Sequence, residues 1–252
     1  IMNPLGEETS VMRTTLIPNM LDVISTNISH KVEEVSAFEC GNTFIPQEGL
    51  PIETKKYCVG MYGKEVDFFV LKGVIESVLN NVGLKGYEIE PETTNLIFHP
   101  GRCAKIVYNN IYIGTFGELH PDVIENYNLG QRVYVAEINI DTVFENLNLT
   151  KSYNPLPKYP STSRDIALIV KDEVFVKQIE DIIKANGEDL VESYKLFDVY
   201  KGAQIEEGHK SIAYSITYRS KDKTLTDEDV AKVHEKILSE LSEKLNANLR
   251  SN

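Results

Sequence analysis

The sequence predicts an α+β protein with two domains, at residues 1–152 and 153–252. Its length of 252 residues corresponds to one large domain or two modest ones. Three prolines between positions 155 and 160 hold the backbone extended and interrupt the hydrogen bonding of helices and sheets. Segments with helical and with strand-like periodicity lie on both sides of these prolines. We therefore predict a linker over 151–160.

The second domain begins with four elements that apolar spacing predicts. Residues 164–170 alternate between apolar and other side chains, as in a strand. Residues 174–186 carry apolar side chains at helical spacing and are followed by Gly187, which predicts a helix with a defined end. Residues 191–200 and 210–219 are predicted to be strands joined by a hairpin loop. The positions predicted to be buried in the first two elements are Ile166, Leu168, Val170, Val176, Ile179, Ile182 and Ile183.

A long helix and a short strand complete this domain. Thr226 is predicted to cap the helix, and the three carboxylates at 227–229 suit the positive end of a helix. Residues 247–250 are predicted to form a closing strand. The resulting order, strand-helix-strand-strand-helix-strand, is the split βαβ order of a ferredoxin-like sandwich. The apolar stripe of the long helix is predicted to contain Val230, Val233, Ile237, Leu241 and Leu245.

The first domain is predicted to be an antiparallel sheet backed by helices. One helix is predicted over 15–30, with Pro18 in its first turn, and another from the capping residue Asp67 to about residue 81. The apolar face of the helix over 15–30 is predicted to contain Leu16, Met20, Val23, Ile24 and Ile28. Strand-like segments lie at 32–40, 55–62, 86–92, 103–108, 111–119 and 132–140.

Composition excludes several classes of protein. The chain is 42% hydrophobic and 25% charged, which is typical of a folded globular chain, and no apolar run approaches the roughly 18 residues of a membrane-spanning helix. Glu7 and Glu8 argue against a signal peptide. Three cysteines, an odd number without a CxxC pair, favour a reducing compartment. We predict a cytoplasmic chain that binds neither membranes nor DNA.

The negative charge is concentrated in the first domain. Residues 1–152 hold 11 Lys and Arg against 20 Asp and Glu, whereas residues 153–252 hold 15 against 18. The second domain therefore has room for a local basic patch, which permits RNA binding but does not demonstrate it.

Motifs of common catalytic and metal sites are absent from the sequence. No two glycines lie two positions apart, so a dinucleotide fingerprint is missing, and a P-loop and a GxSxG motif are missing too. The five histidines show no HxH or HxxxH spacing. We predict neither a catalytic residue nor a metal site in this chain.

Six segments, taken in chain order, resemble one family. They read NPLGEETSVMRTTLIP at 3–18, DFFVLKG at 67–73, HPGR at 99–102, GELHP at 117–121, KYPSTSRDIA at 158–167 and YRSKDKTLTD at 218–227. All are similar to the C-terminal part of the β subunits of bacterial phenylalanyl-tRNA synthetases, and the resemblance covers essentially the whole chain.

The resemblance implies a class II synthetase-like core over 1–152 and a ferredoxin-fold anticodon-binding domain over 153–252. It implies two partners, the catalytic α subunit and tRNA-Phe, and a supporting role in charging that tRNA. ATP and Mg²⁺ are expected only in the α subunit, so no cofactor is expected in this chain. The family's editing domain lies outside the resembling region, so editing is not assigned.

The first domain is predicted to be a pseudo-catalytic core. A class II site needs an Arg-x-Glu or Arg-x-Asp pair and a glycine-rich strand that leads to an arginine able to bind triphosphate. The segment at 132–141 reads RVYVAEINID, with neither a glycine nor a terminal arginine. None of the arginines Arg13, Arg102, Arg132, Arg164 and Arg219 is followed two positions later by a carboxylate.

Several motifs of the first domain have a structural interpretation that we favour over a functional one. The HPGR segment is either a ligand-gripping loop or, preferably, a turn in which Arg102 pairs with an acidic neighbour. The GELHP segment is expected to end a strand and to start a helix near His120. Arg13 is expected to be structural or an interface contact, and Lys72 and Gly73 are expected to be structural. The helix over 15–30 packs either on a partner subunit or on its own domain.

RNA contacts are predicted in the second domain. On the strand over 210–219, buried apolar residues alternate with small polar residues, which form a flat surface able to accept an RNA backbone or splayed bases. This surface is expected to lack the aromatic pair of base-stacking sheets. The arginines are favoured because both lie at strand ends, whereas solvated surface is an equally good interpretation of the lysines. The predicted RNA-binding residues are Lys158, Arg164, Arg219, Lys221 and Lys223.

Two alternative functions stay open at this point. One is a self-sufficient enzyme that activates an amino acid in the first domain. The other is a purely structural module at a subunit interface, because a ferredoxin-like fold alone does not establish RNA binding.

Overall fold

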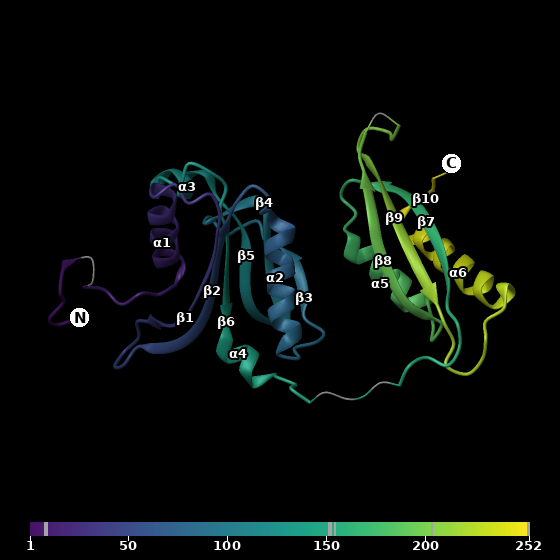
Figure 1. Cartoon of the computed structure of the whole chain (residues 1–252), viewed down its shortest axis with the longest axis horizontal. Helices are drawn as coiled ribbons and strands as arrows, with labels where there is room; N and C mark the ends of the chain where they lie inside the picture. The colour runs from purple at the N-terminus through teal and green to yellow at the C-terminus, as the bar shows by residue number, and fades with distance from the viewer. Residues whose placement is uncertain (8–9, 151–152, 154, 203, 251–252) are drawn as a thin grey trace. The chain divides into compact units, whose positions relative to one another are not determined.

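The computed structural model describes residues 1–7, 10–150, 153, 155–202 and 204–250. The chain divides into two compact units, Ile1–Ser152 and Tyr153–Asn252, and each contains one antiparallel sheet with helices (Figure 1). The predicted α+β class is therefore confirmed. Residues 151, 152 and 154 of the predicted linker lie outside the described residues, and the rest of the linker contains neither helix nor strand.

The first unit is built on a six-stranded antiparallel sheet. Its strand order is β1-β2-β6-β5-β4-β3, so β1 and β3 are the edges. The six strands are β1 (Val35–Ile45), β2 (Ile52–Tyr62), β3 (Glu88–Pro91), β4 (Phe98–Tyr108), β5 (Ile111–Leu119) and β6 (Tyr134–Asn139).

Two long helices cover opposite faces of this sheet. α1 (Ile17–Ser29) packs in one core cluster with Cys58, and α2 (Phe68–Asn81) packs in another with the adjacent Val59. Because successive side chains of a strand point to opposite faces, the sheet lies between the two helices. The unit also contains two short helices, α3 (Pro121–Asn126) and α4 (Ile140–Glu145).

The ends of the long helices follow from local chemistry. The Asp67 carboxylate accepts a hydrogen bond from Val70 N at 2.8 Å, which confirms the predicted cap of α2. One predicted contact of α1 was wrong, because Val23 is 49% exposed whereas Leu21 is buried. The buried stripe of α1 therefore contains Leu21 in place of Val23. α1 approaches β2 closely at Gly60, where a Cβ atom would lie 2.6 Å from Met20 Cγ.

Several strand boundaries of the first unit differ from the prediction; β1, for example, spans Val35–Ile45 where residues 32–40 were predicted. Two of the differences have a clear local cause. The strand predicted at 103–108 begins at Phe98, because the register shift between Phe98 and Cys103 breaks the apolar alternation on which the prediction relied. The strand predicted at 132–140 ends at Asn139, whose side chain accepts hydrogen bonds from the first turn of the unpredicted helix α4. A helix of six residues is too short to show a helical period in sequence.

The second unit is a four-stranded antiparallel sheet with two helices. Its strand order is β10-β7-β9-β8, and the buried side chains of β7 and β9 share one core with both helices. Both helices therefore cover the same face of the sheet. The elements are β7 (Thr162–Lys171), α5 (Val176–Asn186), β8 (Val191–Tyr200), β9 (His209–Tyr218), α6 (Asp227–Leu245) and β10 (Asn248–Leu249).

Every element predicted for the second unit is present. The ferredoxin-like order is confirmed, and Thr226 Oγ1 accepts a hydrogen bond from Asp229 N at 3.2 Å in a capping box. α5 begins two residues later than predicted, because the backbone N–H of Phe175 is capped by Gln178 Oε1 at 2.8 Å. The buried stripe of α6 is as predicted except that Leu245 is only partly buried.

Two further observations concern helix length and the cysteines. Among the described residues, no helix is both long and apolar enough to cross a membrane. The three cysteines are free thiols, of which Cys58 and Cys103 are buried and Cys40 is exposed.

Candidate nucleic-acid interface

One face of the four-stranded sheet is not packed on α5 or α6, and we call it the outer face. Along β9 it carries the residues that alternate with the buried Ile212, Tyr214 and Ile216. The strand register places Ser163, Asp165, Ala167 and the apolar Ile169 opposite them on β7. The outer-face residues of these two strands are Ser163, Asp165, Ala167, Ile169, Ser211, Ala213, Ser215 and Thr217.

At one end of the outer face an arginine is stacked on a tyrosine. Tyr200 is paired with Ser211, so it shares the outer face from β8. The guanidinium carbon of Arg250 lies 5.6 Å from the centre of the Tyr200 ring, and Arg250 Nη2 donates to Gln204 Oε1 at 3.0 Å. The Arg250 backbone N–H bonds to Ala167 O at 2.8 Å on β7. The Arg250–Tyr200 stack therefore crosses the outer face from one edge of the sheet to the other.

This stack corrects two expectations about the outer face. Ser211 and Ala213 are buried, although the face was predicted to be open there, because the stack crosses the sheet at their level. The face was also predicted to lack the aromatic pair of base-stacking sheets, but Tyr200 lies on it and Phe197, at a register shift of β8, is 54% exposed. The strand over 210–219 carries no aromatic residue on this face, and the rings are supplied by the neighbouring strand β8.

The two arginines predicted to contact RNA are already paired within the second unit. Arg164 Nη2 lies 2.6 Å from the Asp227 carboxylate at the start of α6. Arg219 Nε lies 2.8 Å from Glu192, and Arg219 Nη1 donates to Tyr159 O at 2.6 Å. Each guanidinium therefore holds the end of its strand against a neighbouring segment of the same unit.

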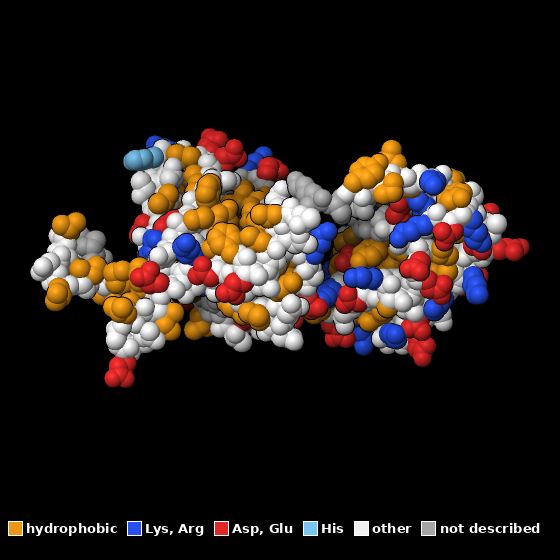
Figure 2. All heavy atoms as spheres, turned by 90° about the horizontal axis from the view of Figure 1, so that it is seen from below, with side chains coloured by type: hydrophobic (Ala, Val, Ile, Leu, Met, Phe, Trp, Pro, Cys, Tyr) orange, Lys and Arg blue, Asp and Glu red, His pale blue; other side chains and the backbone are white. Residues whose placement is uncertain are grey.

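The three predicted lysines divide into two kinds. Lys223 Nζ lies 2.8 Å from Asp229, and this hydrogen bond, together with the Thr226 N–H, lowers the pKa of the Asp229 carboxyl to about 2. Lys158 and Lys221 are exposed and have no ion pair within the described part of the chain. Figure 2 shows positive and negative side chains interspersed over the visible side of the second unit.

Arg250 is the arginine of this unit that sequence reasoning missed. Arg164 and Arg219 each neutralise a carboxylate, whereas Arg250 contacts a neutral amide and an aromatic ring. Among the described residues it is paired with no carboxylate. The predicted cations lie at the Thr217 end of β9, and the Arg250–Tyr200 stack lies at the Ser211 end. These two ends are separated by six residues of strand, which corresponds to about 20 Å.

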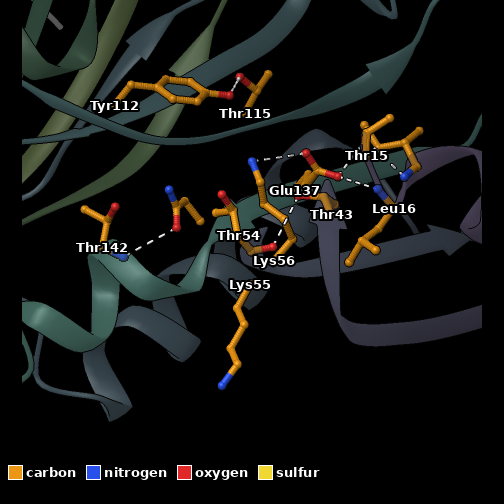
Figure 3. Close-up of polar contacts among 12 residues, drawn as sticks. Thr15, Leu16, Thr43, Thr54, Lys55, Lys56, Tyr112, Thr115, Glu137 and Thr142 are labelled. Carbon is orange, nitrogen blue, oxygen red and sulfur yellow. Dashed lines mark hydrogen bonds and ion pairs between the residues drawn. The ribbon is translucent and has the colours of Figure 1, made fainter. Parts of the chain in front are cut away.

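In the first unit, the sheet face under α1 carries a polar cluster centred on Glu137 (Figure 3). Glu137 Oε1 accepts hydrogen bonds from Thr15 Oγ1 at 2.6 Å and from Leu16 N at 2.7 Å, and Lys56 Nζ lies 3.6 Å from Oε2. The carboxylate thus satisfies an N–H at the start of α1 and holds that helix against β6. Its hydrogen-bonding capacity is used within the unit.

The remaining motifs of the first unit are structural. Arg13 Nη1 lies 2.6 Å from Glu39, and Arg102 Nε lies 2.7 Å from the buried Glu118, which confirms the predicted acidic neighbour of Arg102. The HPGR segment, however, is not a turn but the irregular start of β4.

The two other motifs agree with their structural interpretation. The GELHP segment ends β5 and starts α3, with His120 as the cap, as predicted. Lys72 pairs with Glu76 at 2.6 Å, one helical turn away. No cluster of three or more potential metal ligands occurs within the described residues.

Comparison with known proteins assigns both units to families. The family described as phenylalanyl tRNA synthetase beta chain CLM domain matches residues 1–140, and the family described as ferredoxin-fold anticodon binding domain matches residues 157–250. Among solved structures, a pyrrolysyl tRNA synthetase from Desulfitobacterium hafniense covers 52% of this chain and 48% of its own, with 13% identity and a TM-score of 0.45, which is too low to support an argument.

Relatives match the chain over almost its full length. The phenylalanine–tRNA ligase beta subunit of Clostridium tetani is 46% identical over 99% of this chain, and that of Clostridium acetobutylicum is 45% identical over 99%. In both cases the chain spans 32% of the relative's length. The chain belongs to the phenylalanyl-tRNA synthetase β-chain family.

Proposed function

We propose that this chain acts within a phenylalanine–tRNA ligase, where its second unit binds the anticodon region of tRNA-Phe and its first unit packs on the catalytic α subunit. The proposal rests on the two family matches and on the names of the relatives. It adds residues that the comparisons do not specify, and it places the chain in the cytoplasm with neither DNA nor a membrane as partner.

The observation that carries the RNA-binding role is the Arg250–Tyr200 stack on the outer face. Single-stranded RNA is recognised by unstacked bases that lie on aromatic rings or guanidinium planes. Arg250 supplies a positive charge that no carboxylate of the described residues neutralises, and Tyr200 supplies a ring on the same face.

The predicted cations take different parts in this proposal. Lys158 and Lys221 are exposed and are paired with no carboxylate among the described residues, so they are suited to phosphate contacts. Arg164, Arg219 and Lys223 contact RNA only by exchanging their carboxylate partners, at 2.6–2.8 Å, for a phosphate. We therefore assign these three residues first to holding the strand ends and second to RNA binding.

The first unit is proposed to be non-catalytic, with ATP and Mg²⁺ bound by the α subunit. The polar groups on the sheet face under α1 bind one another, since Glu137 is used by Thr15, Leu16 and Lys56. Amino-acid-dependent exchange of pyrophosphate into ATP by this chain alone would support the alternative of a self-sufficient enzyme.

Binding to two tRNAs tests the proposed role. The affinity of the chain is measured for tRNA-Phe and for the same tRNA with a replaced anticodon, at low and at moderate salt. We expect a preference for the cognate anticodon that falls at least ten-fold in Tyr200→Ala and in Arg250→Ala. Phe175→Ala is the matched control, because Phe175 is 57% exposed next to α5 and away from the outer face. Equal binding of both tRNAs would instead favour a structural module.

A further inference from the structure

The edge strand β1 offers an unpaired backbone over its first half. Its partner on one side is β2, and its other side is the border of the sheet (Figure 1). At one point the border is already used, because Phe44 N donates to Arg13 O at 2.8 Å and Asn42 O accepts from Arg13 Nε at 3.0 Å. The backbone groups of Asn42 and Phe44 therefore point away from β2.

The same alternation identifies the free groups. Backbone direction repeats every second residue in a strand, so Ser36, Phe38 and Cys40 also direct their N–H and C=O groups away from β2. No hydrogen bond to these groups occurs within the described residues. The N-terminal segment thus covers positions 42–44 of the border and leaves positions 36–40 open.

The side chains at the open positions 36, 38 and 40 are exposed, and two of them, Phe38 and Cys40, are apolar. Phe38 is 70% exposed, its ring lies 5.8 Å from that of Tyr57, and Cys40 is exposed beside them. α2 has its main contacts with β5 and β6, which are separated from this border by β2. Figure 2 shows that hydrophobic side chains also gather on the surface of the first unit.

The charge around this border indicates what kind of segment can bind there. Between Lys31 and Lys55 the sequence contains five glutamates and neither lysine nor arginine. Within β1 the single charge is Glu39, which Arg13 neutralises, so the strand lacks the unpaired charges that normally protect an edge from added strands. An extended segment with apolar side chains at every second position and with flanking basic residues fits both the backbone and the charge.

We propose that positions 36–40 of β1 receive a basic, extended segment of the catalytic α subunit, which adds a seventh strand to the sheet. The inference rests on the proposed packing of the first unit on that subunit and specifies where one contact lies. Main-chain hydrogen bonds to Ser36, Phe38 and Cys40 hold the segment, and Phe38 with Tyr57 receives one of its apolar side chains.

Cys40 makes the inference directly testable in the unaltered chain. A thiol-reactive photocrosslinker attaches to Cys40 in preference to Cys58 and Cys103, because these two thiols are buried and burial raises the pKa of both. The labelled chain is mixed with the α subunit, irradiated, and the crosslinked peptide is identified by mass spectrometry. We expect a crosslink to a single extended, basic segment of the α subunit. The matched control carries Cys40→Ser and Val23→Cys, which moves the label to an exposed position of α1 and should give no such crosslink.

Two measurements separate the possible failures. Phe38→Glu should weaken the α-subunit complex at least ten-fold without altering the unfolding of the chain, whereas Val23→Glu should leave the affinity unchanged. If the complex forms but Cys40 gives no crosslink and Phe38→Glu binds normally, the inference is wrong and the proposed function stands. If the chain and the α subunit do not associate at all, the proposed packing fails and the inference fails with it.

Discussion

The two sheets of this chain differ in how many of their faces are covered. The six-stranded sheet lies between α1 and α2, whereas the four-stranded sheet has both of its helices on one face. On the covered sheet, the polar groups around Glu137 bind one another. On the outer face of the other sheet, Arg250 and Tyr200 contact each other, and Arg250 is paired with no carboxylate of the described residues. A face without a helix leaves polar and aromatic groups available for a partner.

The largest expected effect is on the stability of the covered sheet. Phe116 is fully buried and stacks on Phe68 with ring centres 5.2 Å apart. We expect Phe116→Ala to lower the free energy of unfolding by about 3–5 kcal/mol, measured by chemical denaturation. Phe69 lies next to Phe68 on α2, and its ring is 74% exposed, so Phe69→Ala should change the free energy of unfolding by less than about 0.5 kcal/mol. Similar losses of unfolding free energy in both variants would contradict the placement of the sheet between the two helices.

A smaller loss is expected at the polar cluster of the covered sheet. Glu137→Gln removes the charge from two short hydrogen bonds and leaves Lys56 without its partner. We expect a loss of about 1.5–3 kcal/mol in the free energy of unfolding, since hydrogen bonds to charged groups contribute that much. Glu53→Gln, at an exposed end of β2, serves as control. An unchanged midpoint of unfolding would show that Glu137 does not hold α1.

The cap of α6 should contribute about 1 kcal/mol. Thr226→Ala removes the hydroxyl that accepts from Asp229 N, and such caps contribute roughly that amount. The exposed Thr224 provides the control variant, Thr224→Ala, which should be neutral. Thermal unfolding of both variants distinguishes a capping effect from a general sensitivity of this loop.

The smallest expected effect is a pH dependence of the second unit. Burial and the nearby Arg164 lower the pKa of His234, whose Nδ1 lies 2.9 Å from the Tyr218 hydroxyl. Because the unfolded chain takes up this proton at a higher pH, near 6.5, stability is complete above that value and falls as the pH drops towards the lowered folded-state pKa. Denaturation at several pH values between about 5 and 8 should show this slope, and His234→Gln should flatten it. A variant with the unaltered slope would contradict the assignment.

Sequence reasoning recovered what depends on local spacing. The stripe of α6, its cap at Thr226 and the strands around it repeat at the periods that burial on one face imposes. Positions such as Val23 failed because two apolar residues, at 21 and 23, compete for one helical stripe, and only packing decides between them.

The candidate site was harder to predict because its contacts are distant in sequence. Arg250 and Tyr200 are fifty positions apart in the sequence. They meet only because β10 and β8 are the two edge strands of one sheet. Arg164 and Asp227 likewise meet through the packing of α6 on β7. Each residue alone has no pattern in its neighbourhood that indicates a site. The family resemblance identified the domain, whereas the pairing of its charges required the structure.

The internal ion pairs of the second unit set how strongly its RNA binding would respond to dissolved ions. A cation that is already neutralised by a carboxylate does not drive the release of condensed counterions when it meets a phosphate, because its own carboxylate is freed in exchange. Arg164, Arg219 and Lys223 are neutralised in this way, whereas Lys158, Lys221 and Arg250 have no carboxylate partner in the part of the chain that the structure describes. For single strands each phosphate neutralised contributes about −0.7 to the slope of log K against log salt. Three available cations give a slope of about −2 instead of the roughly −4 that all six would give.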